Sequence, residues 1–314
     1  MIPTRRAVLP LLGAIPLVRF PAETIPRAKE TRLLFGGDIM LSRAVARFAH
    51  ERRDPASPLR DVAPMFAAAD IAFANLESPF SDRGRTMDQG MVFKAEPDMI
   101  AGLELAGIDV VSTANNHVRD CGGHGIEYTL QWLEKHGIAA AGTGLTEDAA
   151  HAGAVLERNG TKFGFLGYTY DQTNGNHPDL DDRVAMLEIP QMRADVASLL
   201  ERADVVIVSM HAGIEYAVKP HPQQVTFARA AIDAGARVVV GHHPHVVQPW
   251  ERYRNGVIYY SLGNLVFDQF QRAETQRGAL GQVVFAGHNL ERAEMIPVNI
   301  VKTVPRVAAA AAGA

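Results

Sequence analysis

Two hydrophobic patterns alternate along most of this chain. Short apolar runs of β-type residues recur, and stretches with apolar residues at helical spacing separate them. An apolar run over 32–37 precedes helical patterns over 42–52 and 59–68, and Ser42 is a suitable N-cap for the first of these helices. This alternation predicts an α/β fold.

The pattern continues to about residue 301 without a linker. We expect further strands at 71–74, 109–113 and 205–210, and helices at 99–106, 125–136, 191–202 and 223–234. Asn159-Gly160 between two apolar runs predicts a hairpin, and a polar loop over 171–182 is expected to cover a site. Beyond His245, strands follow at 257–262, 282–286 and 295–301, which favours mixed sheets with helices outside.

Composition sets broad limits on the class of protein. With 314 residues, 47% of them hydrophobic, the chain has enough apolar side chains for a sizeable core. The net charge is −4 and no basic stripe stands out, so we do not expect a nucleic-acid partner. The single cysteine, Cys121, excludes a disulfide within the chain and a thiolate-rich zinc site. We expect Cys121 to be structural, because nothing nearby predicts a thiolate-stabilising pocket.

The N-terminus resembles a twin-arginine export signal. Arg5-Arg6 precede an apolar stretch over 8–18, about half the ~20 residues that span a bilayer. Val8 stands where Phe is commonest, and no small-residue cleavage site is clear. We expect a periplasmic or cell-surface protein; the alternative is a basic leader on a cytoplasmic protein. The expected organisation is a leader over 1–30, one domain over 31–303 and a disordered alanine-rich tail over 304–314.

Five apolar runs end in residues that can bind a metal ion. These residues are Asp38, Glu77, Asn116, His211, and the pair His243 and His245. Each follows a predicted buried strand, at the rim where ligands bind in open α/β sheets. Together they form a mixed oxygen and nitrogen ligand set. His243 and His245 are two positions apart and should point alike, whereas His242 is expected to point elsewhere.

Each position also has a structural alternative. Asp38 is a suitable cap for the next helix, and Glu77 is equally typical of a solvated loop. Asn115-Asn116-His117 is also compatible with an Asx turn that leaves the histidine exposed.

A second group of residues is suited to catalysis or substrate binding. His117 can donate a proton to a leaving group, and Asp120 can orient it if a helical turn begins there. Arg119 can hold an anionic group. Glu215 and Asn264 are candidates for substrate contact, with surface exposure or a structural turn as the alternatives.

Taken together, these motifs resemble the CapA family of capsule or poly-γ-glutamate synthesis proteins. The matching segments run in the family's order: Gly36–Arg43, Asn75–Pro79, Ala114–Asp120, His211–Tyr216, Gly241–Pro249 and Tyr260–Asp268. The resemblance implies a calcineurin-like metallophosphatase fold, a four-layer α/β/β/α sandwich of two mixed sheets. It also implies a role in making, exporting or anchoring a polyanionic surface polymer.

The chain departs from true metallophosphatases in its ligand motifs. Their first motif is Asp-x-His, whereas Met40 stands two residues after Asp38 here. Glu77 stands near their second aspartate, and Val118 replaces the acid after their Asn-His. A thioether is a poor ligand for a hard cation, so the metal count is left open at one or two.

The expected function is therefore that of a metal-dependent hydrolase or transferase. One or two Mn²⁺, Fe²⁺ or Zn²⁺ ions would be held by Asp38, Glu77, Asn116, His211, His243 and His245. The expected substrate is a phosphoester or a γ-glutamyl polymer, and a membrane-bound polymer synthesis complex is the expected partner. The alternative is a non-catalytic, metal-stabilised module that binds an anionic polymer during export or anchoring.

Overall fold

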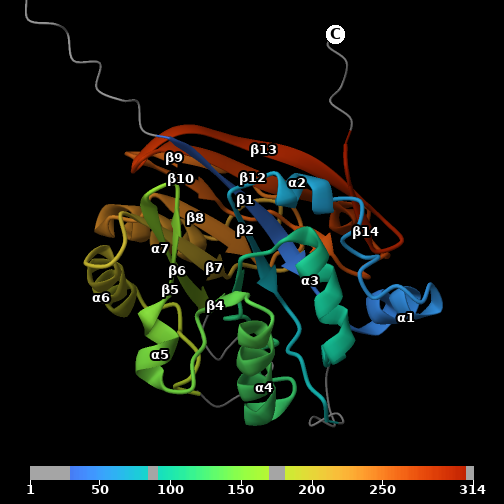
Figure 1. The fold of residues 1–314 in the computed structure, drawn as a ribbon. Helices are drawn as coiled ribbons and strands as arrows, with labels where there is room; N and C mark the ends of the chain where they lie inside the picture. Colours follow the sequence, from blue (N-terminus) through green and yellow to red (C-terminus); the bar gives the residue numbers. More distant parts are fainter. Residues whose placement is uncertain (1–28, 84–90, 170–180, 309–314) are drawn as a thin grey trace, which may run out of the picture.

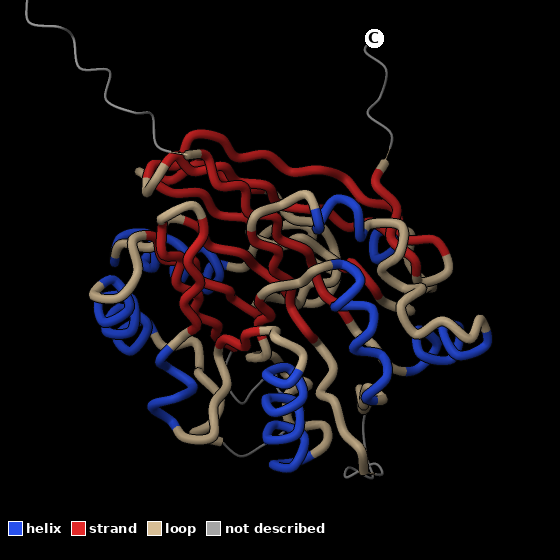
Figure 2. The backbone as a smooth tube through the Cα atoms, in the orientation of Figure 1, coloured by secondary structure: helices blue, strands red, loops and turns tan. Residues whose placement is uncertain are grey.

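Two β-sheets pack face to face, with helices on the outer side of each (Figures 1 and 2). The computed structural model describes residues 29–83, 91–169 and 181–308. The predicted leader and most of the predicted loop over 171–182 lie outside these residues. The four-layer α/β/β/α sandwich of two mixed sheets is confirmed.

The first sheet is built around β1 (Glu30–Ile39). On one side the strands are parallel: β2 (Ile71–Leu76), β3 (Val110–Ser112) and β4 (Ala139–Ala141). On the other side they are antiparallel: β12 (Arg277–Ala286), β13 (Asn289–Val301) and β14 (Val304–Val307). A short strand, β11 (Asn264–Val266), pairs in parallel with the end of β1.

The second sheet holds four parallel strands between two antiparallel edges. In spatial order they are β5 (Ala154–Arg158), β6 (Thr161–Thr169), β7 (Val205–His211), β8 (Val238–His242), β10 (Gly256–Tyr259) and β9 (Trp250–Tyr253). The predicted hairpin joins β5 to β6, and Asn159 and Gly160 both have positive φ, 55° and 79°. A type I′ turn requires this conformation, and Asn-Gly tolerates it best.

Helices cover the outer face of each sheet. Beside the first sheet lie α1 (Arg43–Glu51), α2 (Ala63–Ala67), α3 (Ile100–Ala106) and α4 (Gly122–Lys135). Beside the second lie α6 (Ile189–Leu200) and α7 (Pro222–Ala234), and α5 (Glu147–Ala152) packs near α6. Two 3₁₀ turns cover Pro97–Met99 and Glu274–Gln276. Gly107 ends α3 in the left-handed conformation, as its position predicts.

Aromatic side chains fill the space between the sheets. Phe73 stacks on Phe165 with ring centroids 5.9 Å apart and meets Phe35 edge-on at 5.8 Å. All three are fully buried, and each such side chain stabilises the fold by about 1.5–3 kcal/mol. Because central strands are covered on both faces, their sequences are continuous apolar runs without alternation.

The structure differs from the sequence prediction at the C-terminal boundary. β14 continues the domain past residue 303, where we expected a disordered tail. Its Pro305 lies on an edge strand, where a missing N–H is tolerated. Several short elements, among them β4, β9 and β11, were not predicted, because three or four residues show no usable periodicity.

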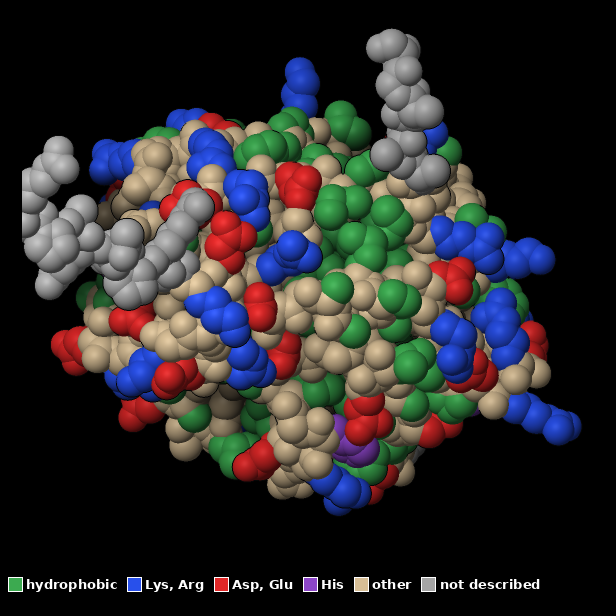
Figure 3. All heavy atoms as spheres, turned by 45° about the horizontal axis from the view of Figure 1, so that its top comes forward, with side chains coloured by type: hydrophobic (Ala, Val, Ile, Leu, Met, Phe, Trp, Pro, Cys, Tyr) green, Lys and Arg blue, Asp and Glu red, His purple; other side chains and the backbone are tan. Residues whose placement is uncertain are grey.

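The surface carries both signs of charge. Lys and Arg side chains lie among Asp and Glu side chains on the face drawn in Figure 3. Within the described part of the chain, we find no helix that combines the length and the apolarity required to cross a bilayer.

Candidate metal centre

The predicted ligands meet where the carboxyl ends of strands from both sheets come together. Asp38 lies near the end of β1, His211 ends β7, and His242 ends β8. In the first sheet Asp38 is in register with Asn75 of β2 and with Asn264 of β11. Asn75 Nδ2 donates to Asp38 Oδ1 over 2.9 Å and lies 3.3 Å from His211 Nδ1, so it links the two sheets.

Glu77 lies at the middle of this cluster. The side chain is fully buried, which rules out the alternative of a solvated loop residue. Among the residues that the structure describes, its Oε1 atom has no hydrogen-bond partner. That oxygen lies 3.6 Å from His245 Nε2 and 3.9 Å from His211 Nε2. A buried carboxylate oxygen without a partner is costly in free energy, and a cation between it and the imidazoles would remove that cost.

Asn116 completes one side of the cluster. Its Oδ1 atom lies 2.9 Å from His211 Nε2. The neighbouring Asn115 points back into the protein, where Nδ2 donates to the carbonyl of Leu76 over 2.8 Å and Oδ1 accepts the amide of His117 over 3.1 Å. The last bond is the predicted Asx turn, yet His117 is buried and not exposed. The Asx turn of the structural alternative is therefore present, but the exposed histidine that it included is not.

The loop after β8 holds its histidines in a strained backbone. His243 has φ 94° and His245 has φ 58°, a region that non-glycine residues seldom adopt. The amide of His243 donates to Asp38 Oδ2 over 3.3 Å, which ties this loop to the end of β1. Strain of this kind persists only where surrounding contacts fix it, and it clusters at functional sites.

Asn264 lies behind His245. Its Oδ1 atom lies 3.0 Å from His245 Nδ1, while its Nδ2 donates to Gln269 Oε1 and to the carbonyl of Thr275. With Nδ1 held on that side, Nε2 is the ring nitrogen that faces Glu77. Such contacts behind a histidine ligand fix its tautomer and orientation.

The electrostatics favour a cation at this position. Burial lowers the pKa of His211, and it lowers the pKa of His243 to about 3, so both rings are neutral and in the ligand-competent form. Burial and then the neighbouring Asp38 and Glu215 raise the pKa of Glu77 well above its usual range. Burial by itself would also raise the pKa of Asp38, but contacts from His242 and His245 outweigh it and hold that pKa well below its usual range. The neutral rings of His211 and His243 therefore lie in the same cluster as the carboxylates of Asp38 and Glu77, a mixed donor set suited to a divalent cation.

The donor atoms fit a divalent ion in spacing as well as in kind. Two atoms bound to one ion at ~2.1 Å can lie no more than ~4.2 Å apart. The distances from Asn116 to His211, His211 to Glu77 and Glu77 to His245 are 2.9, 3.9 and 3.6 Å. Two groups of three residues place their donor atoms within 4.8 Å of one another inside each group. The first group is Asp38, Glu77 and His245, and the second is Glu215, His243 and His245.

Acid should destabilise the metal-free protein through His243. A histidine whose folded pKa is lowered contributes stability above its unfolded pKa of 6.5, and that stability is lost as the pH falls towards the folded pKa of about 3. Between pH 7 and pH 5 the wild type should therefore lose about 2 kcal/mol more than His243→Gln. Urea denaturation of both proteins at both pH values measures this difference. Equal losses in the two proteins would contradict the neutral, buried state of this ring.

His117 and Asp120 form a buried pair beside the cluster. His117 Nδ1 lies 2.7 Å from Asp120 Oδ2, the contact that the i, i+3 spacing anticipates. The same carboxylate oxygen accepts the amide of Phe93 over 2.7 Å, and the Phe93 ring stacks on His117 with centroids 3.7 Å apart. His117 directly follows Asn116, whose Oδ1 lies 2.9 Å from His211 Nε2, so the pair lies next to the proposed ligands.

The three predicted substrate contacts differ in position. Arg119 Nε lies 3.4 Å from Asp181 Oδ2, so its guanidinium is paired with a carboxylate. Glu215 is exposed and lies among the proposed ligands, next to His243 and His245. Asn264 is fully buried and bonded within the protein, which corrects its predicted role: it supports His245 and does not face substrate.

Two further residues, His242 and Ser42, differ from expectation. His242 does not point away from the cluster; its Nδ1 lies 3.2 Å from Asp38 Oδ1 because its backbone extends β8 directly towards β1. Met40 is buried and its sulfur accepts the Ser42 hydroxyl over 3.0 Å, which explains why Ser42 occupies the N-cap of α1 without a side-chain cap bond. Asp38 does not cap this helix.

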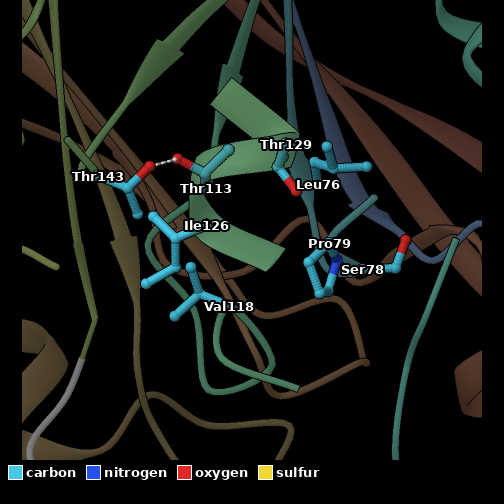
Figure 4. Close-up of a pocket in the computed structure, with 8 residues that line it drawn as sticks. All are labelled: Leu76, Ser78, Pro79, Thr113, Val118, Ile126, Thr129 and Thr143. Carbon is cyan, nitrogen blue, oxygen red and sulfur yellow. Dashed lines mark hydrogen bonds between the residues drawn. The ribbon is translucent and has the colours of Figure 1, made fainter. Parts of the chain in front are cut away.

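A small cavity lies behind the loop that carries Asn115, Asn116 and His117. Figure 4 shows its lining, which includes Thr113 and Thr143 joined by a hydrogen bond of 2.6 Å. Its volume of about 10 Å³ has room for about one water molecule. This cavity is therefore too small for a substrate.

Relatives of this chain carry related names. A PGA biosynthesis protein CapA of Bacillus subtilis is 33% identical over 279 residues, which cover 86% of this chain and 72% of that protein. A capsule biosynthesis protein CapA of Bacillus anthracis is 30% identical, with 86% and 67% covered. A probable polyglutamine synthesis accessory protein of Mycobacterium tuberculosis is 28% identical, with 74% and 67% covered.

Solved structures share the fold. A phosphatase from Mycoplasma pneumoniae superposes with a TM-score of 0.57 at 13% identity, covering 87% of this chain and 94% of that one. A hypothetical protein from Thermus thermophilus gives a TM-score of 0.56 at 19% identity, with 86% and 100% covered. These likenesses support the metallophosphatase-like, calcineurin-like fold and say nothing of the reaction.

The family assignment follows from a match over most of the domain. The sequence pattern of the family described as bacterial capsule synthesis protein PGA_cap covers residues 32–269, which include every predicted ligand. This chain therefore belongs to the bacterial capsule synthesis protein family PGA_cap.

Proposed function

We propose that this protein is a metal-dependent hydrolase or transferase that acts on an anionic surface polymer or its phosphoester precursor. Its relatives are named for capsule and PGA biosynthesis, which supports a role in the same process. The γ-glutamyl polymer is the preferred substrate of the two, because those names refer to the polymer and the solved neighbour called a phosphatase shares only the fold.

One observation carries this proposal. The buried Oε1 of Glu77 has no hydrogen-bond partner among the described residues and lies 3.6 Å from His245 Nε2 and 3.9 Å from His211 Nε2, within the ~4.2 Å that two ligand atoms of one ion can span. An apolar residue would fill a purely structural position at lower cost in free energy, since burying a carboxylate without a partner is unfavourable. The residues that would hold the ion are Asp38, Glu77, Asn116, His211, His243 and His245, with Glu215 as an added candidate.

Each residue then has a distinct part in the reaction. A bound divalent ion supplies Lewis acidity and makes water a usable nucleophile near neutral pH. His117 donates a proton to the leaving group, and Asp120 holds the imidazole through Nδ1. Phe93 covers one face of that imidazole and so limits the access of water to it. Asn264 keeps His245 in the tautomer that a ligand requires.

A non-catalytic binding module is the second candidate function. The observation in its favour is Met40, which stands two residues after Asp38 and whose sulfur is bonded to Ser42. That position therefore offers no ligand, which reduces the donors available to one of two ions. In this alternative the ion stabilises the domain and the protein binds the polymer without cleaving it.

Turnover before and after metal removal separates the two candidates. We expect the purified protein to cleave or transfer oligo-γ-glutamate or a phosphoester, to lose that activity on chelation, and to regain it with Mn²⁺, Fe²⁺ or Zn²⁺. Activity that persists in the chelated, metal-free protein would reject the proposed mechanism. Polymer binding without turnover in the metal-loaded protein would favour the second candidate.

We also propose that the protein is exported and works with a membrane-bound polymer synthesis complex. The support is the arginine pair Arg5-Arg6 before an apolar stretch. Fractionation of cells that express the wild type and a variant with Arg5→Lys and Arg6→Lys tests export. The wild type should be found outside the cytoplasm and the variant inside; identical distribution of the two would count against a twin-arginine signal.

A further inference from the structure

Arg43, which has no part in the function proposed above, shares an aromatic neighbour with the proposed proton donor. Arg43 opens α1, just after β1 delivers Asp38 to the centre. Its guanidinium carbon lies 5.3 Å from the centre of the Phe93 ring. The same ring stacks on the imidazole of His117 at 3.7 Å. The Phe93 ring therefore has a positive charge and the imidazole of the proposed proton donor as neighbours.

A second arginine approaches from another segment. The guanidinium carbon of Arg272 lies 4.6 Å from the centre of the Tyr216 ring, and that ring lies 6.5 Å from the His245 ring. Both arginines act on Tyr216: burial and then Glu215 raise the pKa of its hydroxyl, and Arg272 and Arg43 oppose that rise. Geometry links them as well: Asp268 lies 3.2 Å from the Arg43 guanidinium, and the next residue, Gln269, donates from Nε2 to the Tyr216 hydroxyl over 3.4 Å. Arg43, Tyr216 and Arg272 thus form one group, here called the arginine rim.

The backbone of the arginine rim is strained in the same way as the loop that carries His243 and His245. Arg43 has φ 55° and Tyr216 has φ 65°, both in the left-handed region that disfavours side chains. Asp268 holds the backbone at Arg43 in place. One of its carboxylate oxygens accepts the amide of Ala44 over 3.0 Å, and the other lies 3.2 Å from the Arg43 guanidinium. The amide of Tyr216 donates to the carbonyl of Pro244 over 2.8 Å. Fixed strain of this kind is typical of sites that hold a ligand.

Charge explains why such a rim is useful here. Asp38, Glu77 and the exposed Glu215 give the centre a surplus of carboxylates, which would repel an anionic chain. Arginine offers a planar fork of donors that matches a carboxylate or a phosphate, and it stays charged at every relevant pH. Arg272 is exposed, and the side chain of Arg43 is 36% exposed, so both can reach a ligand.

We propose that Arg43 and Arg272 bind oxyanion groups of the substrate, and that their occupant is the row of carboxylates on a γ-glutamyl chain. Two guanidinium groups from separate segments suit an extended ligand with repeated charges better than a ligand with one charged group. The proposal rests on the proposed function and names the residues that select its substrate. Tyr216 lies between the arginines and supplies the aromatic face on which Arg272 packs.

Binding of oligo-γ-glutamate to the metal-loaded protein tests the rim. The variants are Arg272→Ala, at an exposed position, and Arg43→Lys, which keeps the charge beside Asp268 and protects the fold. Each should weaken binding about tenfold, since a charge-assisted hydrogen bond is lost or impaired. The slope of log Kd against log salt should also fall for Arg272→Ala, with metal content unchanged. The matched control is Arg47→Ala, also on α1, with a side chain that is 64% exposed and paired with Glu51.

The binding test of the arginine rim can fail or succeed independently of the turnover test of the proposed function. Weaker γ-glutamyl binding in both rim variants and not in Arg47→Ala supports the rim, and a parallel loss of inorganic phosphate binding is consistent with it. Unchanged γ-glutamyl binding, a loss confined to phosphate, or an equal loss in the control overturns it. The measurement requires no turnover, so a protein that binds through the rim but never reacts would reject the proposed catalysis alone.

Discussion

Replacement of His117 by asparagine should lower turnover by about 10²–10⁴-fold, the usual contribution of a general acid. The reason is its position: it is buried, it is held by Asp120 through a 2.7 Å contact, and it follows Asn116, whose Oδ1 lies 2.9 Å from His211 Nε2. Asparagine keeps a polar group at that position and cannot donate an ionisable proton. The metal content should be unchanged, because His117 is not among the proposed ligands. Steady-state kinetics and elemental analysis of the same preparation measure both quantities.

A second histidine–aspartate pair provides the control for this prediction. His50 of α1 lies 2.9 Å from Asp98 and its side chain is 42% exposed. His50→Asn makes the same chemical change in a similar pair and should leave turnover within about twofold of the wild type, as expected for an exposed position without a role in the reaction. A similar loss in both variants would mean that the effect of His117→Asn is structural, and full activity of His117→Asn would remove it from the mechanism.

Replacement of Glu77 by glutamine should have opposite effects on activity and on the stability of the metal-free protein. Turnover should fall to background, because the carboxylate that lies between His211 and His245 is lost. The metal-free variant should be more stable than the metal-free wild type by about 1–3 kcal/mol, the cost of a buried group left unsatisfied. Trade-offs of this sign are typical of functional sites.

The stability of the metal-free wild type should also change with pH in a defined direction, and that of Glu77→Gln should not change in this way. Because burial and nearby carboxylates raise the folded pKa of Glu77, the metal-free wild type loses stability as the pH rises above about 4.5 through that raised pKa. The glutamine variant should lack this part of the pH dependence. Saturating metal, at about 100 times its Kd, should stabilise the wild type by about 2.7 kcal/mol and the variant little or not at all.

Glu51→Gln on the exposed face of α1 is the matched control for Glu77→Gln. Its side chain is 63% exposed and its partner Arg47 lies 3.9 Å away, so its stability should change by no more than about 0.5 kcal/mol. Urea denaturation with and without metal compares all three proteins. If metal-free Glu77→Gln were less stable than the metal-free wild type, Glu77 would be a structural residue and the metal assignment would lose its main support.

The strand ends could be predicted from the sequence because burial leaves a local signature. Asp38 and His211 each follow a run of apolar β-type residues, and the residue at such a boundary lies at the rim of the sheet. The pair His117 and Asp120 was also accessible, since a turn brings i and i+3 together. The family resemblance then supplied the fold, which two neighbouring solved structures support.

What the sequence did not reveal depends on contacts between distant segments. Nothing local predicts that Asn264 faces His245, because β11 reaches the centre only by pairing with β1. His242 was expected to point away on the basis of strand alternation, and it contacts Asp38 because the two sheets converge there. In the arginine rim, Arg43 and Tyr216 lie in segments that match the family, but Arg272 belongs to no motif, and the strained φ of Arg43 is visible only in three dimensions.

Elemental analysis of the purified protein tests the central claim most directly. If Asp38, Glu77, Asn116 and the three histidines form a metal centre, the wild type should contain or take up one or two divalent ions of Mn, Fe or Zn per chain. Glu77→Gln should hold clearly less. A wild-type protein that is isolated without metal and takes up none of these ions on titration at neutral pH would contradict the account.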